Sequence, residues 1–170
     1  FGRAEVSFNG KYNVSATYRR DGSSKFHPDK RWGNFWSAGF AWNVSKEDFF
    51  QNSALRRYVD NLKIKGSYGT QGNASIGNYQ HLGLVSSGGK FMEATTKYLG
   101  QPQNAGLTWE QQALFTVGLS GRLFNRLDFN FEFYNRVTTD MLMDVPYNYT
   151  TGFSSLKANV GSLSNKGVDL

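Results

Sequence analysis

The sequence predicts an all-β fold, an antiparallel up-and-down transmembrane β-barrel segment of about seven strands with one short helix near residues 46–58. Two observations predict this fold. Apolar and polar residues alternate along several segments with a period of two, which gives each strand one apolar and one polar face. The connections between these segments are of two kinds, as in outer-membrane barrels with short periplasmic turns and longer extracellular loops.

The clearest alternation lies in a predicted hairpin between residues 113 and 145, whose two arms meet in a tight turn at residues 124–126. Each arm has about ten residues, which at ~3.3 Å per residue and a tilt near 45° span roughly 23 Å, close to the apolar band of a membrane barrel. Strands in soluble sandwiches are usually shorter, with a mode of about five or six residues. The hairpin favours the barrel and leaves a soluble sandwich as the alternative.

The elements before this hairpin follow in order. A strand over residues 1–8 is followed by an Asn-Gly-Lys turn at residues 9–11, because Asn-Gly is the strongest short hairpin signal. A second strand begins at residue 12 and leads into a polar loop over residues 19–34, which contains turn formers and one proline. The third strand covers residues 36–44.

The middle of the chain is less regular. Ser45 is a suitable cap for the short helix, and two acidic residues follow it in the first turn. A fourth strand is predicted over residues 62–68. Residues 69–106 are rich in Gly, Ser, Asn and Gln and are predicted to be a long loop with one short strand at residues 78–85.

After the hairpin, residues 146–155 form another predicted loop and residues 156–170 a last strand, in which Gly161 and Gly167 indicate bends. Traced strand by strand, the three long connections fall at one end of the sheet. The tight turns and the short helix fall at the other end, which is the arrangement of an outer-membrane barrel.

Composition and charge exclude several classes of function. The chain has no cysteine, so it holds neither a disulfide nor a thiolate metal site. Its net charge is +6, but Lys and Arg are scattered rather than gathered on one face, so we expect no nucleic-acid partner. His27 and His81 fall in predicted loops without a partner motif and are expected to be solvated. We therefore predict no catalytic residues, no metal site, no cofactor and no enzyme activity.

Three sets of residues are candidates for function. In a barrel, the polar faces of the strands line the lumen and the apolar faces meet lipid. The candidate lumen-facing residues are Lys63, Lys65, Arg122, Asp128, Asn130 and Glu132. The candidate lipid-facing residues are Phe40, Trp42, Phe129, Phe131 and Phe133. The candidate substrate-binding aromatic residues of the loops are Phe26, Trp32 and Tyr79. The competing interpretations are packing within the loops and, for Trp32, a place in the aromatic girdle at the headgroup level.

Two other functions remain open at this point. A soluble carbohydrate-binding β-sandwich would place Phe129, Phe131 and Phe133 between two sheets. An envelope hydrolase built on a barrel would need a Ser-His or metal arrangement, and the sequence offers no such constellation.

Several runs of the sequence, in this order, resemble the SusC/RagA family of TonB-dependent outer-membrane transporters. These runs are Arg19–Phe50, Val59–Tyr79, Leu107–Leu119, Phe133–Pro146, Thr150–Ser155 and Asn159–Leu170.

The resemblance implies a barrel of the kind with 22 strands and a plugged lumen in the bacterial outer membrane. It also implies import of a glycan or peptide, a SusD-like surface lipoprotein as a lid, and a contact with the TonB complex. We therefore expect residues 1–170 to be an internal piece of the C-terminal barrel domain that contains no plug, TonB box or signal peptide.

Overall fold

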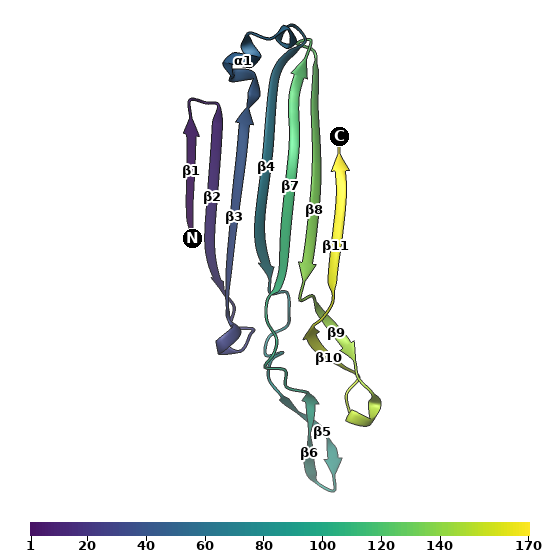
Figure 1. Ribbon diagram of the computed structural model, residues 1–170. Coiled ribbons are helices and arrows are strands. Elements are labelled where there is room, and N and C mark those ends of the chain that lie inside the picture. The colour runs from purple at the N-terminus through teal and green to yellow at the C-terminus, as the bar shows by residue number, and fades with distance from the viewer.

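The computed structural model describes the whole chain from Phe1 to Leu170. Its main element is a seven-stranded antiparallel sheet in the order β1-β2-β3-β4-β7-β8-β11 (Figure 1). The strands are β1 (Gly2–Phe8), β2 (Tyr12–Gly22), β3 (Trp32–Asn43), β4 (Val59–Asn73), β7 (Glu110–Leu123), β8 (Leu127–Thr139) and β11 (Ser162–Asp169). Each strand pairs with the strand that precedes or follows it within the sheet, which confirms the predicted up-and-down order.

The two ends of the sheet differ in their connections (Figure 1). At the end that we call the short-turn end lie the turns after β1 and β7 and the helical connection between β3 and β4. At the opposite, long-loop end lie two further hairpins and two 3-10 turns. These are β5 (Leu84–Phe91) with β6 (Ala94–Gln101), β9 (Leu142–Pro146) with β10 (Ser155–Asn159), η1 (Pro28–Lys30) and η4 (Tyr149–Thr151).

The single helix predicted near residues 46–58 is wrong in detail. The connection consists of η2 (Val44–Lys46), α1 (Asp48–Gln51) and η3 (Ala54–Arg57). Its apolar residues are spaced irregularly, so no face of a longer helix would be buried, and a new turn begins where the Ser53 hydroxyl accepts a hydrogen bond from the Leu55 amide. No helix of the structure has both the length and the apolar character needed to cross a membrane.

Two strand predictions also need correction. Residues 69–106 are not a loop with one short strand at residues 78–85, because β4 continues to Asn73 and β5 and β6 form a hairpin. Residues 78–83 lie outside any strand, and β5 begins only at Leu84. Both strands of this hairpin are largely exposed, so no alternation marks them in the sequence. The predicted strand over residues 156–170 is divided into β10 and β11 at Gly161, whose φ of +78° suits glycine.

Buried side chains are few and lie near the ends of the sheet. Of 170 residues, 12 are buried, and the buried apolar ones gather around Phe26 and Trp109 at the long-loop end or around Phe50 at the short-turn end. In the middle of the sheet Val117 and Phe131 remain 41% and 42% exposed. A β-sandwich buries such residues between two sheets. The fold is therefore a single wall, and the sandwich alternative is wrong.

Candidate functional site

The two faces of the wall carry different side chains. Directly paired residues share a face, and the register runs from Trp42 across Ile64 and Leu119 to Phe131. The same alternation puts all five candidate lipid-facing residues on this apolar face. It puts all six candidate lumen-facing residues on the opposite, polar face. Each of the two sets therefore shares one face of the sheet.

Two ion pairs cross the strands on the polar face. Arg122 donates from both Nε and a terminal nitrogen to the Asp128 carboxylate, at 2.7 and 2.9 Å. Lys65 reaches over β7 to Glu132, with 2.5 Å between Nζ and a carboxylate oxygen. The residue between them is Gly118, and a Cβ there would lie 2.7 Å from the Lys65 Cε. The glycine therefore leaves room for the lysine side chain to cross the middle strand.

Further polar pairs continue this face toward the long-loop end. The Ser67 and Thr116 hydroxyls are 2.7 Å apart, the Gln71 amide donates to Gln112, and Asn73 donates to the Glu110 carboxylate at 3.2 Å. A hollow of about 410 Å³ lies on the same part of the sheet and is lined by Ser15, Thr17, Ser37 and Ser67 together with Phe35 and Leu114. The polar pairs make this part of the face suited to water and polar solutes.

The remaining two candidate lumen-facing residues, Lys63 and Asn130, lie between the two ion pairs. Lys63 is paired with Ser120, which is paired in turn with Asn130, so these three side chains form one row across β4, β7 and β8. Lys63 and Ser120 also line a hollow of about 500 Å³ beside Arg122 and Asp128. The structure holds no group of three or more His, Asp or Glu side chains arranged to bind a metal ion.

An apolar cluster joins the loops at the long-loop end. Phe26 from the β2–β3 connection packs against Trp109, with ring centroids 5.4 Å apart, and Phe35 meets the same ring at 5.6 Å. Ile76 and Leu107 complete the cluster. The cluster joins the β2–β3 connection to the segment around Trp109, about 80 positions later in the sequence. The Trp109 indole adds a hydrogen bond to the Arg31 carbonyl at 3.2 Å.

The three candidate substrate-binding aromatics have different environments. Phe26 is fully buried, so its ring belongs to the loop cluster and is closed to any ligand, which corrects its assignment. Trp32, at the start of β3, is 55% exposed and lies under the Arg20 guanidinium at 4.8 Å. Tyr79 is 62% exposed and has a φ of +62°. Only the latter two rings are open to a solute.

The expectation that both histidines are solvated is wrong for His81. Its side chain is buried, and its Nδ1 lies 2.9 Å from the Lys25 carbonyl oxygen. The His27 ring meets it edge-on, with centroids 6.3 Å apart. His81 thus ties the β2–β3 connection to the segment before β5.

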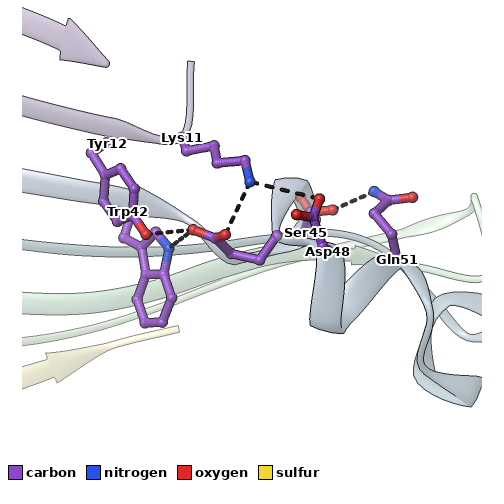
Figure 2. A network of polar contacts seen from close by, with 7 residues as sticks. Lys11, Tyr12, Trp42, Ser45, Asp48 and Gln51 are labelled. Carbon is purple, nitrogen blue, oxygen red and sulfur yellow. Dashed lines mark hydrogen bonds and ion pairs between the residues drawn. The ribbon is translucent and has the colours of Figure 1, made fainter. Parts of the chain in front are cut away.

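A polar network at the short-turn end was not foreseen from the sequence (Figure 2). One carboxylate oxygen of Glu47 accepts hydrogen bonds from the Tyr12 hydroxyl at 2.6 Å and the Trp42 indole at 3.0 Å. The other accepts from the Lys11 ammonium at 3.1 Å, and the same ammonium lies 3.8 Å from Asp48. No spacing of these residues in the sequence signals that they meet.

These donors stabilise the ionised form of Glu47. Hydrogen bonds from Tyr12, Trp42 and Lys11, in that order of effect, lower the pKa of Glu47 to about 2. The same carboxylate raises the pKa of Lys11, chiefly through the hydrogen bond between them. Glu47 therefore stays charged under all physiological conditions and joins the first turn to the connection that follows β3.

Comparisons with known proteins agree with this architecture. A family model described as "TonB dependent receptor-like, beta-barrel" matches residues 1–170. The chain is 33% identical to TonB-dependent receptor P39 of Formosa agariphila, with 100% of this chain and 16% of that protein aligned. It is 31% identical to TonB-dependent receptor SusC of Bacteroides thetaiotaomicron, with 99% and 17% aligned.

Among solved structures, the RagAB peptide importer in its closed-closed state superposes with a TM-score of 0.90 and 38% identity, over 98% of this chain and 18% of that one. The open-open state gives a TM-score of 0.86 at the same identity. The chain spans less than a fifth of the length of these relatives. With the sheet order and the separated faces, these matches show that residues 1–170 belong to the β-barrel of the TonB-dependent receptor family, in its SusC/RagA branch.

Proposed function

We propose that this chain forms part of the barrel wall and extracellular loops of a transporter that imports a glycan or peptide across the bacterial outer membrane. The separation of the two faces is the observation that carries the proposal. Charged, amide and hydroxyl side chains dominate one face of the long strands, and apolar side chains such as Ile64, Leu119 and Phe131 dominate the other. A wall between water and lipid suits both faces.

In this proposal Lys63, Lys65, Arg122, Asp128, Asn130 and Glu132 face the lumen. The pairs that Lys65 forms with Glu132 and Arg122 forms with Asp128 support a role in the wall, because these charges are already partnered and are not free for a solute. Lys63 is the one cation of this set that forms no ion pair, so its charge is the one free to meet a passing substrate or a plug.

The lipid-facing role of Phe40, Trp42, Phe129, Phe131 and Phe133 follows from the same register. Val117 and Phe131 of this face are exposed in the isolated sheet, and covering them with acyl chains removes apolar surface from water. The loops at the opposite end from the short turns are then extracellular. Tyr79 is the aromatic residue that we propose for contact with the substrate. Trp32 shares its face of β3 with Phe40 and Trp42, so we propose that its ring lies at the level of the lipid headgroups instead.

The partners follow from family membership. A SusD-like surface lipoprotein as a lid, and a TonB contact made by a part of the protein outside these 170 residues, are the partners proposed. The RagAB transporter is described as a peptide importer, which supports a peptide here. A glycan is kept as the other class because the resemblance to the SusC/RagA family implies import of either one.

The test uses the full-length protein in its own host. Cells with and without the gene are offered labelled peptides and labelled oligosaccharides, in the presence and absence of a protonophore. We expect one class to enter only when the gene is present and the proton-motive force is intact, and the protein to be extracted from the outer membrane only by detergent. A water-soluble, monodisperse full-length protein, or unchanged uptake of both classes, contradicts the proposal.

A further inference from the structure

The connection between β3 and β4 lies beside the apolar face of the wall. Tyr12 and Trp42 are directly paired across β2 and β3, and their rings stack with centroids 6.2 Å apart. Both side chains project from the apolar face of the sheet. The polar tips of both side chains donate to Glu47 (Figure 2). The Glu47 carboxylate, and with it the start of α1, is therefore held on the side of the sheet that we assign to lipid.

Large apolar side chains at this end are uncovered. They belong to the β3–β4 connection and to the turn between β7 and β8, where the rings of Tyr58 and Phe124 meet edge-on at 5.9 Å. Phe49 and Phe124 are 62% and 60% exposed, and Leu55 and Tyr58 are similarly open. These residues lie at the same end of the sheet as the Tyr12–Trp42 pair of the apolar face.

Cations without an acidic partner accompany these apolar residues. Lys46, Arg56, Arg57 and Arg126 are exposed and form no ion pair. The nearby acids are engaged elsewhere: Glu47 and Asp48 lie against Lys11, and the Asp60 carboxylate accepts the Asn125 amide at 2.5 Å. Four free positive charges thus border an apolar edge.

We propose that this short-turn surface, made of Lys46, Phe49, Leu55, Arg56, Arg57, Tyr58, Phe124 and Arg126, binds anionic phospholipid of the periplasmic leaflet. The inference rests on the proposed membrane position of the wall. Arginine and lysine side chains carry apolar stems and bind phosphate groups at the level of the headgroups, while rings and leucine enter the acyl boundary. Glu47 acts as the positioning residue that keeps the connection at this depth.

An acidic periplasmic protein is the competing occupant, since it would also match the free cations. Lipid is favoured because the exposed rings and free cations lie together at the end of the sheet where the proposed wall meets the periplasmic leaflet, beside the Tyr12–Trp42 pair of the apolar face. An acidic protein would match the cations but does not account for the exposed rings beside them. After reconstitution in pure lipid, either anionic phospholipid or an acidic protein stays bound to this surface, so one experiment distinguishes the two.

The experiment reconstitutes the full-length protein in vesicles of phosphatidylcholine with a minority of phosphatidylglycerol. The lipid that stays with the protein after extraction in polymer-bounded discs is then quantified by mass spectrometry. The wild-type protein is expected to enrich phosphatidylglycerol over phosphatidylcholine. In the double variant R56Q/R57Q at low salt, this enrichment should fall by a factor of up to about five for each cation removed. Raising the salt concentration should weaken the enrichment.

The matched control is K90Q/K97Q, which removes two exposed, unpaired cations from the β5–β6 hairpin at the opposite end. It should leave the enrichment unchanged, and the single variant R126Q should reduce it. Equal enrichment of phosphatidylglycerol in wild type and R56Q/R57Q overturns the inference. An inserted wild-type protein that shows no preference between the two lipids also overturns it. So does a wild-type protein that retains an acidic periplasmic protein in place of the anionic lipid. A protein that fails to insert at all refutes the proposed function as well, which distinguishes the two failures.

Discussion

At the level of single residues, Glu47 joins β2, β3 and the connection after β3, because three side chains donate to its carboxylate. The group is only 13% exposed and yet charged, since its donors replace the hydrogen bonds of water. Tyr12 and Trp42 are thereby fixed with their polar tips toward one point. An aromatic pair at the end of the sheet's apolar face is in this way oriented by one acid.

The first prediction concerns pH. With a folded pKa of about 2, below the usual 4.5, Glu47 contributes stability that is fully present above about pH 4.5 and is lost as the pH falls through 2. The variant E47Q should unfold at a lower temperature than wild type at neutral pH, and this difference should shrink between pH 4.5 and 2. Thermal unfolding of the full-length protein in detergent measures it.

The control for this measurement is D48N, because the Asp48 side chain is 94% exposed. It removes the same charge one residue further along the chain and should leave the melting temperature nearly unchanged. A gap between wild type and E47Q that stays constant down to pH 2 would contradict the assignment.

The second prediction concerns the open loop ring of Tyr79. Tyr79→Ala should weaken substrate binding by roughly 2- to 10-fold, as expected for the loss of one aromatic contact of about 0.5–1.5 kcal/mol. Titration of the full-length protein with the imported substrate measures the change. Trp32→Ala, which removes a similarly exposed ring from the apolar face of β3, is the control and should leave the affinity unchanged. Unchanged affinity in Tyr79→Ala would remove this ring from the site.

At the level of elements, cross-strand pairs set the register of β4, β7 and β8. The third prediction uses Gly118, where a methyl group would lie 2.7 Å from the Lys65 Cε and 3.0 Å from the Phe131 carbonyl oxygen. Gly118→Ala should displace Lys65 from Glu132 and cost about 1–3 kcal/mol of unfolding free energy. Gly66→Ala is the matched control in the same sheet, because its methyl group would meet only the Thr116 carbonyl at 3.7 Å.

Denaturant unfolding of the two variants in the same detergent makes this comparison. Equal stability of Gly118→Ala and Gly66→Ala would show that Lys65 does not need the path over β7.

The loop cluster is a second unit at this scale, and the fourth prediction concerns its centre. Phe26→Ala removes a fully buried ring and should destabilise the loops by about 3–5 kcal/mol, while the seven-stranded sheet keeps its protection. Hydrogen exchange should rise around Trp109 and in residues 74–82, the segment that follows β4 and contributes Ala74 and Ile76 to the Phe26 cluster. Loss of protection throughout the sheet, or in no segment, would contradict a separate loop core.

The long strands could be predicted from the sequence because one face is apolar and the other polar, which imposes a strict period of two, as from Phe129 to Phe133. The prediction failed for segments in which the two faces do not differ in this way. The β5–β6 hairpin is exposed on both faces, so its residues follow no pattern. Phe26 was misassigned because burial in a loop depends on Trp109, more than 80 positions away, and the Glu47 network depends on contacts of the same long-range kind.

At the level of the whole molecule, the chain is an open sheet whose outer strands are β1 and β11. Unpaired strand edges are not stable in lipid, because their backbone groups have no partners there. The relatives are more than five times longer than this chain, so further strands of the same barrel are the expected neighbours of both edges. The polar and apolar faces then become the inner and outer surfaces of the wall.

The most direct test of this account compares neighbouring positions 130 and 131, which lie on opposite faces of β8. This chain has no cysteine, so the variants Asn130→Cys and Phe131→Cys can be labelled singly once any cysteines elsewhere in the full-length protein are replaced. In reconstituted vesicles, a fluorophore at position 131 should be quenched by brominated lipid, and the thiol of the Asn130→Cys variant should react with a water-soluble maleimide. Reaction of the Phe131→Cys variant with the water-soluble reagent, together with quenching at position 130, would contradict the assignment of the two faces.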